Sequence, residues 1–227
     1  MQLKLETSPA ADGNEVFQFK IWLRGISPMI WRRVQVSADM TLRELHGVIQ
    51  VAMGWEGIHL FQFNLRAARF GSLELSARSP DVALKELRLR KGARFTYEYL
   101  NISWEHEVRL EEQLHRQSGR TYPRCVAGNG ACPAEGCGGP AAYLVQRTAW
   151  HSDEGLDDLA VMAEFVDEVV LKDHTEHLED SDLAEEMRDV LERLEIRRSW
   201  QGTPFLRRTV NTRLKKGDHL SLMHQQW

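Results

Sequence analysis

The feature that most restricts the fold is one helical pattern set between strand patterns. Residues 41–54, TLRELHGVIQVAMG, place apolar side chains on one helical face. Thr41 and Glu44 form a capping-box pair at its start, and Gly54 ends it. The segments VFQFKIWL and MIWRRVQV before it, and HLFQFNL after it, alternate in the manner of half-buried strands. Two strands, a helix and more strands, without a regular βαβ repeat, predict an α+β fold.

Two further strand patterns follow. In RFTYEYL the aromatic residues alternate, and in WEHEVRLEE the alternation places His106, Val108 and Leu110 on one face, toward the interior. We therefore expect a mixed β-sheet packed on one main helix, of the ubiquitin-like β-grasp type, within residues 1–150.

The distribution of charge divides the chain. Residues 1–150 carry 19 basic and 15 acidic side chains, whereas residues 151–195 carry 3 basic and 17 acidic ones, a net charge of −14. This change predicts a boundary near residue 150.

The second part of the chain reads as helical. LDDLAVMAEFVDEVV and DLAEEMRDVLERLE repeat apolar residues at helical spacing among carboxylates. The basic end, PFLRRTVNTRLKKGDHLSLMHQQW, predicts a hairpin that turns at residues 216–218. Residues 151–227 are thus expected to be an acidic helical extension that ends in a basic hairpin.

All three cysteines lie in one glycine- and proline-rich loop, at Cys125, Cys132 and Cys137. Zinc favours sets of four thiolate and imidazole ligands, and a bound ion can order such a loop. His106 is the leading fourth ligand because its strand leads into the loop. A closed set of four protein ligands would make the zinc structural rather than catalytic. Other candidates for the fourth ligand are His115, His151 and Glu135. The alternative is three small buried thiols that pack the loop.

The cell compartment follows from simple patterns. The first residues, MQLKLETSPAADGNE, lack the basic and apolar regions of a secretion signal, and no apolar run reaches the ~18–20 residues that cross a bilayer. An odd number of cysteines also argues against a disulfide framework. We expect a cytoplasmic protein with reduced thiols and no membrane contact.

Several ordered motifs resemble one family. LRGISPMIWRRVQV, the Leu-His helix, MGWEGIH, WEHEV and YPRCVAGNGACPAEGCGGP, found within residues 15–145, resemble the family first described from ORF-3 of a root-inducing plasmid. The resemblance implies an α+β fold, an association with mobile genetic elements and a resolvase label carried by members. It implies no established activity.

This chain departs from the family pattern in one place. YEYLNISW stands where the family commonly has an acidic turn, Tyr-Asp-Phe-Gly-Asp, so residues 99–103 lack its aspartates and glycine. A function that needs those acidic groups is therefore in doubt for this chain. The sequence after residue 150 has no clear family counterpart.

The motifs argue against recombination and other common chemistry. Ser8 lies in a polar leader without a nearby arginine to stabilise phosphoryl transfer, and no helix-turn-helix accompanies it. The chain also contains no Gly-rich phosphate loop, GxSxG or HExxH motif. We therefore expect a non-enzymatic interaction or accessory module with a structural zinc site.

Four residues are candidates for a partner surface: Trp55, His59, Arg32 and Arg33. Aromatic residues in a loop need burial or a partner, and adjacent arginines on a strand face opposite ways, so at most one of them is exposed. The alternative, a purely structural interpretation, places both tryptophans, Trp31 and Trp55, in the core. The acidic helices predict a protein partner, or a basic surface of the same chain, rather than nucleic acid.

Two alternative functions remain open. One is a metal-dependent enzyme that uses the Trp55, His59 and His106 neighbourhood. The other is a DNA-binding accessory protein, which would show steep salt dependence.

Overall fold

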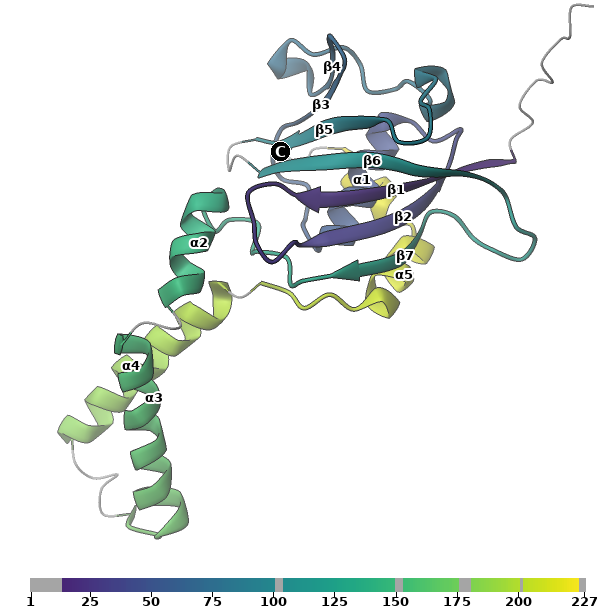
Figure 1. Cartoon of the computed structure of the whole chain (residues 1–227). Helices are drawn as coiled ribbons and strands as arrows, with labels where there is room; N and C mark the ends of the chain where they lie inside the picture. Colours follow the sequence, from purple (N-terminus) through teal and green to yellow (C-terminus); the bar gives the residue numbers. More distant parts are fainter. Residues whose placement is uncertain (1–13, 101–103, 150–152, 176–180, 201, 225–227) are drawn as a thin grey trace, which may run out of the picture. The chain divides into compact units, whose positions relative to one another are not determined.

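The structure is a computed structural model that describes residues 14–100, 104–149, 153–175, 181–200 and 202–224. Ser8 and residues 101–103, where the family pattern breaks, lie outside the described residues. The chain forms two compact units. One comprises Met1–Gly130 with Phe205–Trp227, and the other comprises Ala131–Pro204. We call them the sheet unit and the helical unit (Figure 1).

The sheet unit is built on seven strands in the order β4-β3-β5-β6-β1-β2-β7, and every strand pair is antiparallel. The expected mixed sheet of the β-grasp type is thus replaced by an antiparallel one. The strands span β1 Glu15–Leu23, β2 Trp31–Ser37, β3 Phe61–Leu65, β4 Ala68–Gly71, β5 Arg94–Tyr99, β6 Trp104–His115 and β7 Arg124–Asn129.

Side chains alternate across the sheet as the sequence predicts. In β1, Phe19, Ile21 and Leu23 are buried while the residues between them are partly exposed. In β6, His106, Val108 and Leu110 are all fully buried, so the predicted inward face is confirmed. One face of the sheet therefore forms the core.

Helix α1, Leu42–Met53, begins and ends where the capping pattern places it. Glu44 N donates to Thr41 Oγ1 (3.1 Å), Thr41 N donates to a carboxylate oxygen of Glu44 (2.6 Å), and Gly54 closes the helix in the left-handed conformation at φ 90°. Two short 3₁₀ turns, η1 Leu73–Leu75 and η2 Leu84–Leu87, follow β4 and precede β5.

Two C-terminal helices complete the sheet unit in place of the expected basic hairpin. These are α5, Arg207–Lys216, and α6, Asp218–Leu222, which lie on the same side of the sheet as α1 (Figure 1). The turn at Gly217 is present at φ 87°, but it joins helices rather than strands. Helix α6 packs so closely on α1 that a Cβ on Gly47 would lie 2.0 Å from the carbonyl oxygen of His219.

Helix α5 also covers the β7 edge of the sheet. Cys125 N donates to Asn211 Oδ1 (2.8 Å), and Asn211 Nδ2 donates to the Cys125 carbonyl (2.8 Å). One side chain thus satisfies a backbone donor and an acceptor that an edge strand leaves open.

The helical unit contains α2 Gly139–Ala149, α3 Asp153–Phe165, a π-helical turn Val166–Leu171 and α4 Ser181–Trp200. Buried Asp158 on α3 forms ion pairs with Arg193 (2.8 Å) and Arg197 on α4, which fixes the two helices together. The predicted acidic helices are present.

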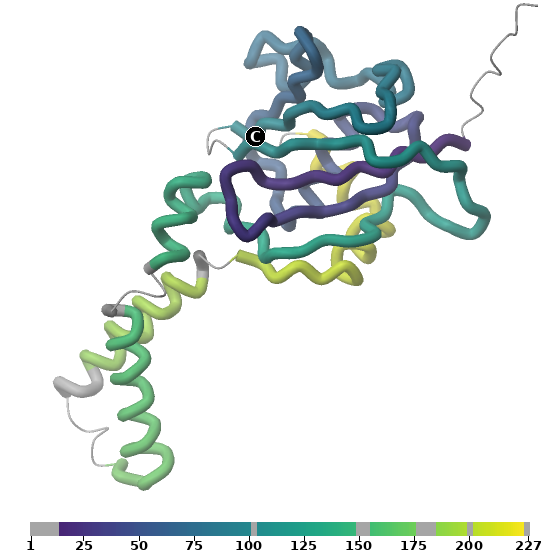
Figure 2. The backbone as a smooth tube through the Cα atoms, in the orientation of Figure 1, coloured from purple at the N-terminus to yellow at the C-terminus, as the bar shows by residue number. Residues whose placement is uncertain are grey.

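The units are bounded differently from the expected 1–150 and 151–227. The cysteine loop after residue 130 and helix α2 belong to the helical unit, while residues 205–227 return to the sheet unit, as the backbone trace shows (Figure 2). The charge change near residue 150 marks a change of surface within the helical unit rather than its start. Among the described residues, the helices are too short or too polar to cross a bilayer.

Candidate functional site

The three cysteines are buried but fall in two units. Cys125 lies on β7 in the sheet unit, where burial raises the pKa of its thiol. Cys132 and Cys137 lie in the helical unit, and Cys132 forms a two-residue bridge with Thr203 through hydrogen bonds of 3.2 and 3.1 Å. None of the three forms a disulfide.

The sheet register separates His106 from Cys125. His106 on β6 lies opposite Leu23 of β1, whereas Cys125 on β7 pairs with Val34 of β2. Three strand spacings therefore lie between them, about 14 Å at ~4.8 Å each. Zinc ligand atoms lie about 2 Å from the ion, so these two side chains do not bind the same one.

The expected Cys₃His set therefore does not fit as one site. Within the ranges that the structure describes, no group of three or more His, Cys, Asp or Glu side chains is arranged to hold a metal ion. Zinc binding by the cysteines stays a prediction, with His106 removed from the ligand set.

The structure brings Trp55, His59 and His106 near Tyr99 and Trp104, with Trp55 and His106 buried and His59 partly exposed. The Trp55 ring lies 5.3 Å from the His106 ring and 5.4 Å from that of Tyr99, and His59 N donates to the Tyr99 hydroxyl (3.0 Å). Trp55 is 1% exposed and His106 is 0% exposed. Burial lowers the pKa of His106 to about 3, against the hydrogen bond of the ring to the Tyr97 carbonyl. Trp55 and Tyr97 are thus part of an aromatic core around the neutral ring of His106.

A second histidine, His46 on α1, extends this core. Its ring stacks on Phe61 at 3.8 Å, and its Nδ1 lies 2.7 Å from the hydroxyl of Tyr97. Gln50 Nε2 donates to the same hydroxyl (2.7 Å), so we assign the Tyr97 proton to the bond with His46. Burial and the nearby Arg43 charge lower the pKa of His46 to about 3. Sequence alternation did not reveal this group because its members lie on a helix and three strands.

Arg32 belongs to the core and not to a partner surface. It is 1% exposed, and its guanidinium lies 4.3 Å from the centre of the Phe205 ring. The guanidinium donates to four backbone carbonyls at 2.8–3.0 Å, those of Ala52, Trp31, Asn129 and Gly130. The side chain joins β2 to the end of α1 and to the end of β7.

Arg33 faces the other way, as strand geometry predicts. It forms a two-point ion pair with Glu111 (2.5 and 3.0 Å) and lies 5.2 Å from the centre of the Trp31 ring. The bond to Glu111 raises the pKa of Arg33 and lowers that of the carboxyl. Its charge is therefore already matched.

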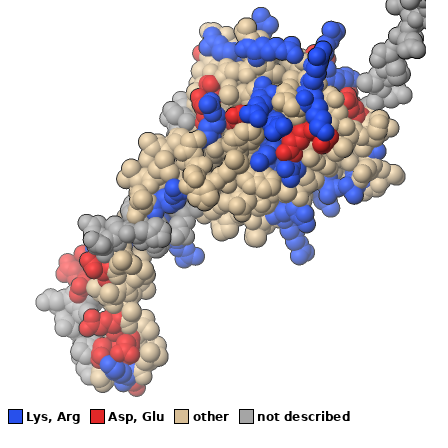
Figure 3. All heavy atoms as spheres, in the orientation of Figure 1, with Lys and Arg blue, Asp and Glu red and all other residues tan. Residues whose placement is uncertain are grey.

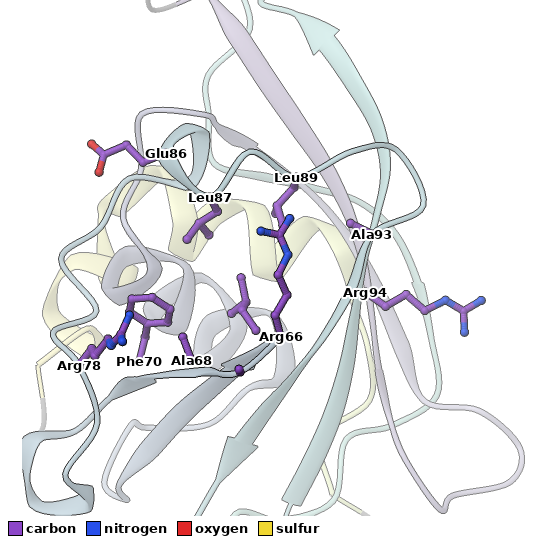
Figure 4. Close-up of a pocket in the computed structure, with 11 residues that line it drawn as sticks. Arg66, Ala68, Phe70, Arg78, Glu86, Leu87, Leu89, Ala93 and Arg94 are labelled. Carbon is purple, nitrogen blue, oxygen red and sulfur yellow. The ribbon is translucent and has the colours of Figure 1, made fainter.

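A pocket that sequence reasoning missed lies at the β3–β4 hairpin. Its volume is about 400 Å³, and it is formed by residues 65–68, 70, 78, 86, 87, 89, 93 and 94. The floor is apolar and includes Leu65 and Leu89, both buried, together with Phe70 and Leu87. We call it the arginine pocket because Arg66 and Arg78 stand over that floor (Figure 4).

The backbone fixes both arginines in place. Arg66 sits at φ 54° in the tight turn between β3 and β4, whose register pairs Leu65 with Ala68. Arg78 N donates to the Arg69 carbonyl (2.9 Å), and Gly71 N donates to the Arg78 carbonyl (3.0 Å), so residue 78 runs beside β4. The walls are thus preformed in the sheet unit.

The pocket carries unmatched positive charge. Among the residues that the structure describes, neither Arg66 nor Arg78 has an ion pair, whereas Arg94 pairs with Glu107 (3.0 Å). In Figure 4, Arg78 lies beside Phe70 and Arg66 beside Leu89, while Glu86 and Arg94 point away. The sequence feature that could have pointed to this pocket is local charge. Residues 61–94 hold 8 basic and 3 acidic side chains, a net charge of +5.

The helical unit has a broader groove of about 830 Å³. Its lining is mainly Ala134, Met162, Leu191 and Leu194, with Glu195 and Arg198 at the side. On the same helices Leu156 is 58% exposed and Leu191 51% exposed. Such exposed apolar groups among carboxylates are typical of a protein contact surface.

Comparisons with known proteins place this architecture in one family. The chain is 29% identical over 136 residues to the uncharacterized protein y4hQ of Sinorhizobium fredii (strain NBRC 101917 / NGR234), a match that covers 56% of this chain and 69% of that protein. It is similar to the crystal structure of a protein of unknown function, MM3350, from Methanosarcina mazei Go1. That match has a TM-score of 0.59 and 31% identity, and it covers 63% of this chain and 85% of the other. The family model for plasmid pRiA4b ORF-3-like proteins matches residues 15–181, and the chain therefore belongs to that family.

Proposed function

We propose that the protein is a non-enzymatic accessory module that holds a phosphate-bearing partner in the arginine pocket. The observation that carries this proposal is the pair Arg66 and Arg78, which stand without an ion pair among the described residues beside a preformed 400 Å³ pocket. Arginine is suited to such a role because its planar guanidinium binds phosphate oxygens at two points.

The alternative of a metal-dependent enzyme at Trp55, His59 and His106 has weaker support. A catalytic metal needs an open ligand position for water or substrate. Trp55 and His106 are 1% and 0% exposed, so their neighbourhood offers a solvent-borne substrate little access. The arginine pocket opens at the surface of the hairpin and needs no rearrangement to receive an anion.

The proposal is tested by titrating the protein with inorganic tripolyphosphate in low salt and measuring the heat of binding. We expect saturable binding that the Arg66→Ala and Arg78→Ala variants each weaken at least about tenfold, since a charged hydrogen bond contributes about 1.5–3 kcal/mol. Arg208→Ala is the matched control, because Arg208 is an exposed arginine on α5 at the opposite edge of the sheet. Equal weakening in all three variants would contradict a specific pocket.

The helical unit supports a second, separate contact. We propose that its groove takes a basic amphipathic helix from a protein partner, because apolar Met162, Leu191 and Leu194 line it within a segment of net charge −14. A designed lysine- and leucine-rich helical peptide should bind, and Leu191→Ser should weaken it. A peptide of the same composition in scrambled order is the control for charge alone. If it binds equally, the groove has no role.

A further inference from the structure

The arginine pocket has more apolar surface than a phosphate group needs. A phosphate uses the guanidinium groups of Arg66 and Arg78 at the rim, which leaves the floor of Leu65, Leu87 and Leu89 without a use. Ligand sites of about 300–1,000 Å³ usually combine such an apolar lining with a few polar groups that orient the ligand. The ligand therefore joins an anionic group to an uncharged body.

The side of the pocket offers faces for a planar group. Phe70, on β4, is partly exposed, and the guanidinium of Arg78 lies beside it in Figure 4. Nucleic-acid bases stack on aromatic rings and on guanidinium planes. This juxtaposition favours a base over an alkyl chain, which would gain nothing from the planar cation.

Further arginines adjoin the pocket-lining residues in the sequence. Arg69, Arg88 and Arg90 are exposed and, like the two rim arginines, have no ion pair among the described residues. Figure 3 shows Lys and Arg side chains gathered along the edge of the sheet unit where Figure 1 places β3 and β4. A mononucleotide would use only the rim arginines, whereas a polymer with one phosphate per residue can also contact cations outside the pocket.

We propose that the partner is a single-stranded nucleic acid, one base of which enters the arginine pocket while its backbone follows the exposed arginines. This inference rests on the proposed function. A duplex fits less well because its bases are stacked and paired, and moving one into a pocket costs a few kcal/mol.

The test compares three ligands by fluorescence anisotropy at low salt: a labelled 12-nucleotide single strand, the duplex of the same sequence, and a 12-residue abasic phosphodiester strand. We expect the single strand to bind at least about tenfold more tightly than the abasic strand, because stacking contributes about 1–3 kcal/mol per base. Its affinity should fall with added salt, since phosphate contacts release counterions. An unlabelled phosphoserine peptide serves as competitor.

Two variants test the stacking faces, and the first of them separates the base from the phosphate. Phe70→Leu removes the ring but keeps an apolar side chain, and Arg78→Lys keeps the charge but removes the planar group. We expect each variant to lose at least about fivefold in affinity for the single strand. Binding of tripolyphosphate should change less than about twofold in Phe70→Leu, whereas Arg78→Lys should weaken it as well, because Arg78 also binds the phosphate. Circular dichroism melting confirms that the variants are folded, and Arg208→Ala is the control for charge.

Each outcome has one meaning. Equal affinity for the abasic and the base-containing strands overturns the inference but leaves the proposed phosphate site standing. Tighter binding of the duplex, or displacement of the strand by the phosphopeptide at lower concentration, also overturns it. Binding of neither tripolyphosphate nor any strand removes the proposed function itself.

Discussion

Individual polar residues in the core of the sheet unit are buried to an unusual degree. His46, His106 and Arg32 are each at most 1% exposed, although these residue types usually reach solvent. The two histidines stay neutral, while Arg32 keeps its charge by donating to backbone carbonyls. Their contributions to stability differ accordingly, and each can be measured.

The buried histidines make stability depend on pH. Both have folded-state pKa values of about 3, below the ordinary value of 6.5, so the unfolded chain takes up their protons first. Their contribution is complete above about pH 6.5 and is lost as the pH falls toward 3, by up to ~1.4 kcal/mol per pH unit for each histidine. Urea unfolding at pH 7, 6 and 5 measures this slope. In His106→Gln the slope should correspond to about one proton fewer taken up on unfolding. An unchanged slope would contradict the lowered pKa of His106.

The adjacent arginines Arg32 and Arg33 form a natural pair for comparison. Arg32→Lys loses the guanidinium that donates to four carbonyls, and we expect a fall of about 2–4 kcal/mol in the free energy of unfolding. Arg33→Lys changes a partly exposed ion pair with Glu111 and should cost less than about 1 kcal/mol. Chemical denaturation of the two variants gives both values. Equal losses would show that the guanidinium of Arg32 adds nothing beyond its charge.

Zinc binding is testable at the level of single ligands. Elemental analysis of the purified protein should find one zinc per chain that Cys132→Ser and Cys137→Ser, both in the helical unit, lose, since thiolates are its preferred ligands. His106→Gln should retain it, because His106 is enclosed by the rings of Trp55 and Tyr97 in the core of the sheet unit. Loss of zinc from the histidine variant would contradict that placement. Protein without metal would leave the three thiols as packing groups.

At the scale of elements, the sequence predicts those features that depend on residues close together in the chain. Thr41, Glu44 and Gly54 fixed α1 to the residue because capping bonds are local. The hairpin prediction around Gly217 was wrong because a left-handed glycine ends a helix as readily as it turns a hairpin. The spacing of residues in the sequence could not predict the arginine pocket. Its floor forms only when Leu87 and Leu89 pack next to Leu65 of the β3–β4 hairpin.

The contact of α5 with β7 gives a prediction for one element. Asn211→Ala leaves the Cys125 amide and carbonyl without their side-chain partner, and we expect a loss of about 1–3 kcal/mol. Because the β7 edge is then less well protected, the variant should also self-associate more readily on mild heating. Thermal unfolding and light scattering measure the two effects. Thr209→Ala, an exposed change on the same helix, should show neither.

At the scale of the whole molecule, the sheet unit is discontinuous in sequence. Gly128 lies so close to Phe205 that an added Cβ would come within 2.7 Å of the ring, although the helical unit separates them in the chain. The charge change near residue 150 could not reveal this, because the return of residues 205–227 depends on tertiary packing of Val210 and Leu214, which are buried.

Replacing residues 131–204 by a short Gly/Ser linker should therefore leave the sheet unit folded, since the two ends already meet. Deleting residues 205–227 should unfold it, because α5 and α6 are lost. Tryptophan fluorescence and circular dichroism melting distinguish the two chains. A folded deletion beside an unfolded linker variant would contradict the division into units.

The position of α5 in the sequence also has a consequence for synthesis. Strand β7 leaves the ribosome long before Asn211 does, since the residues of the helical unit are translated between them. The nascent sheet thus exposes an unpaired edge strand, which can pair with other chains, for the several seconds that translating about 80 residues takes at ~5–20 residues per second. Cells that make this protein must tolerate or shield that edge until α5 and α6 have been translated.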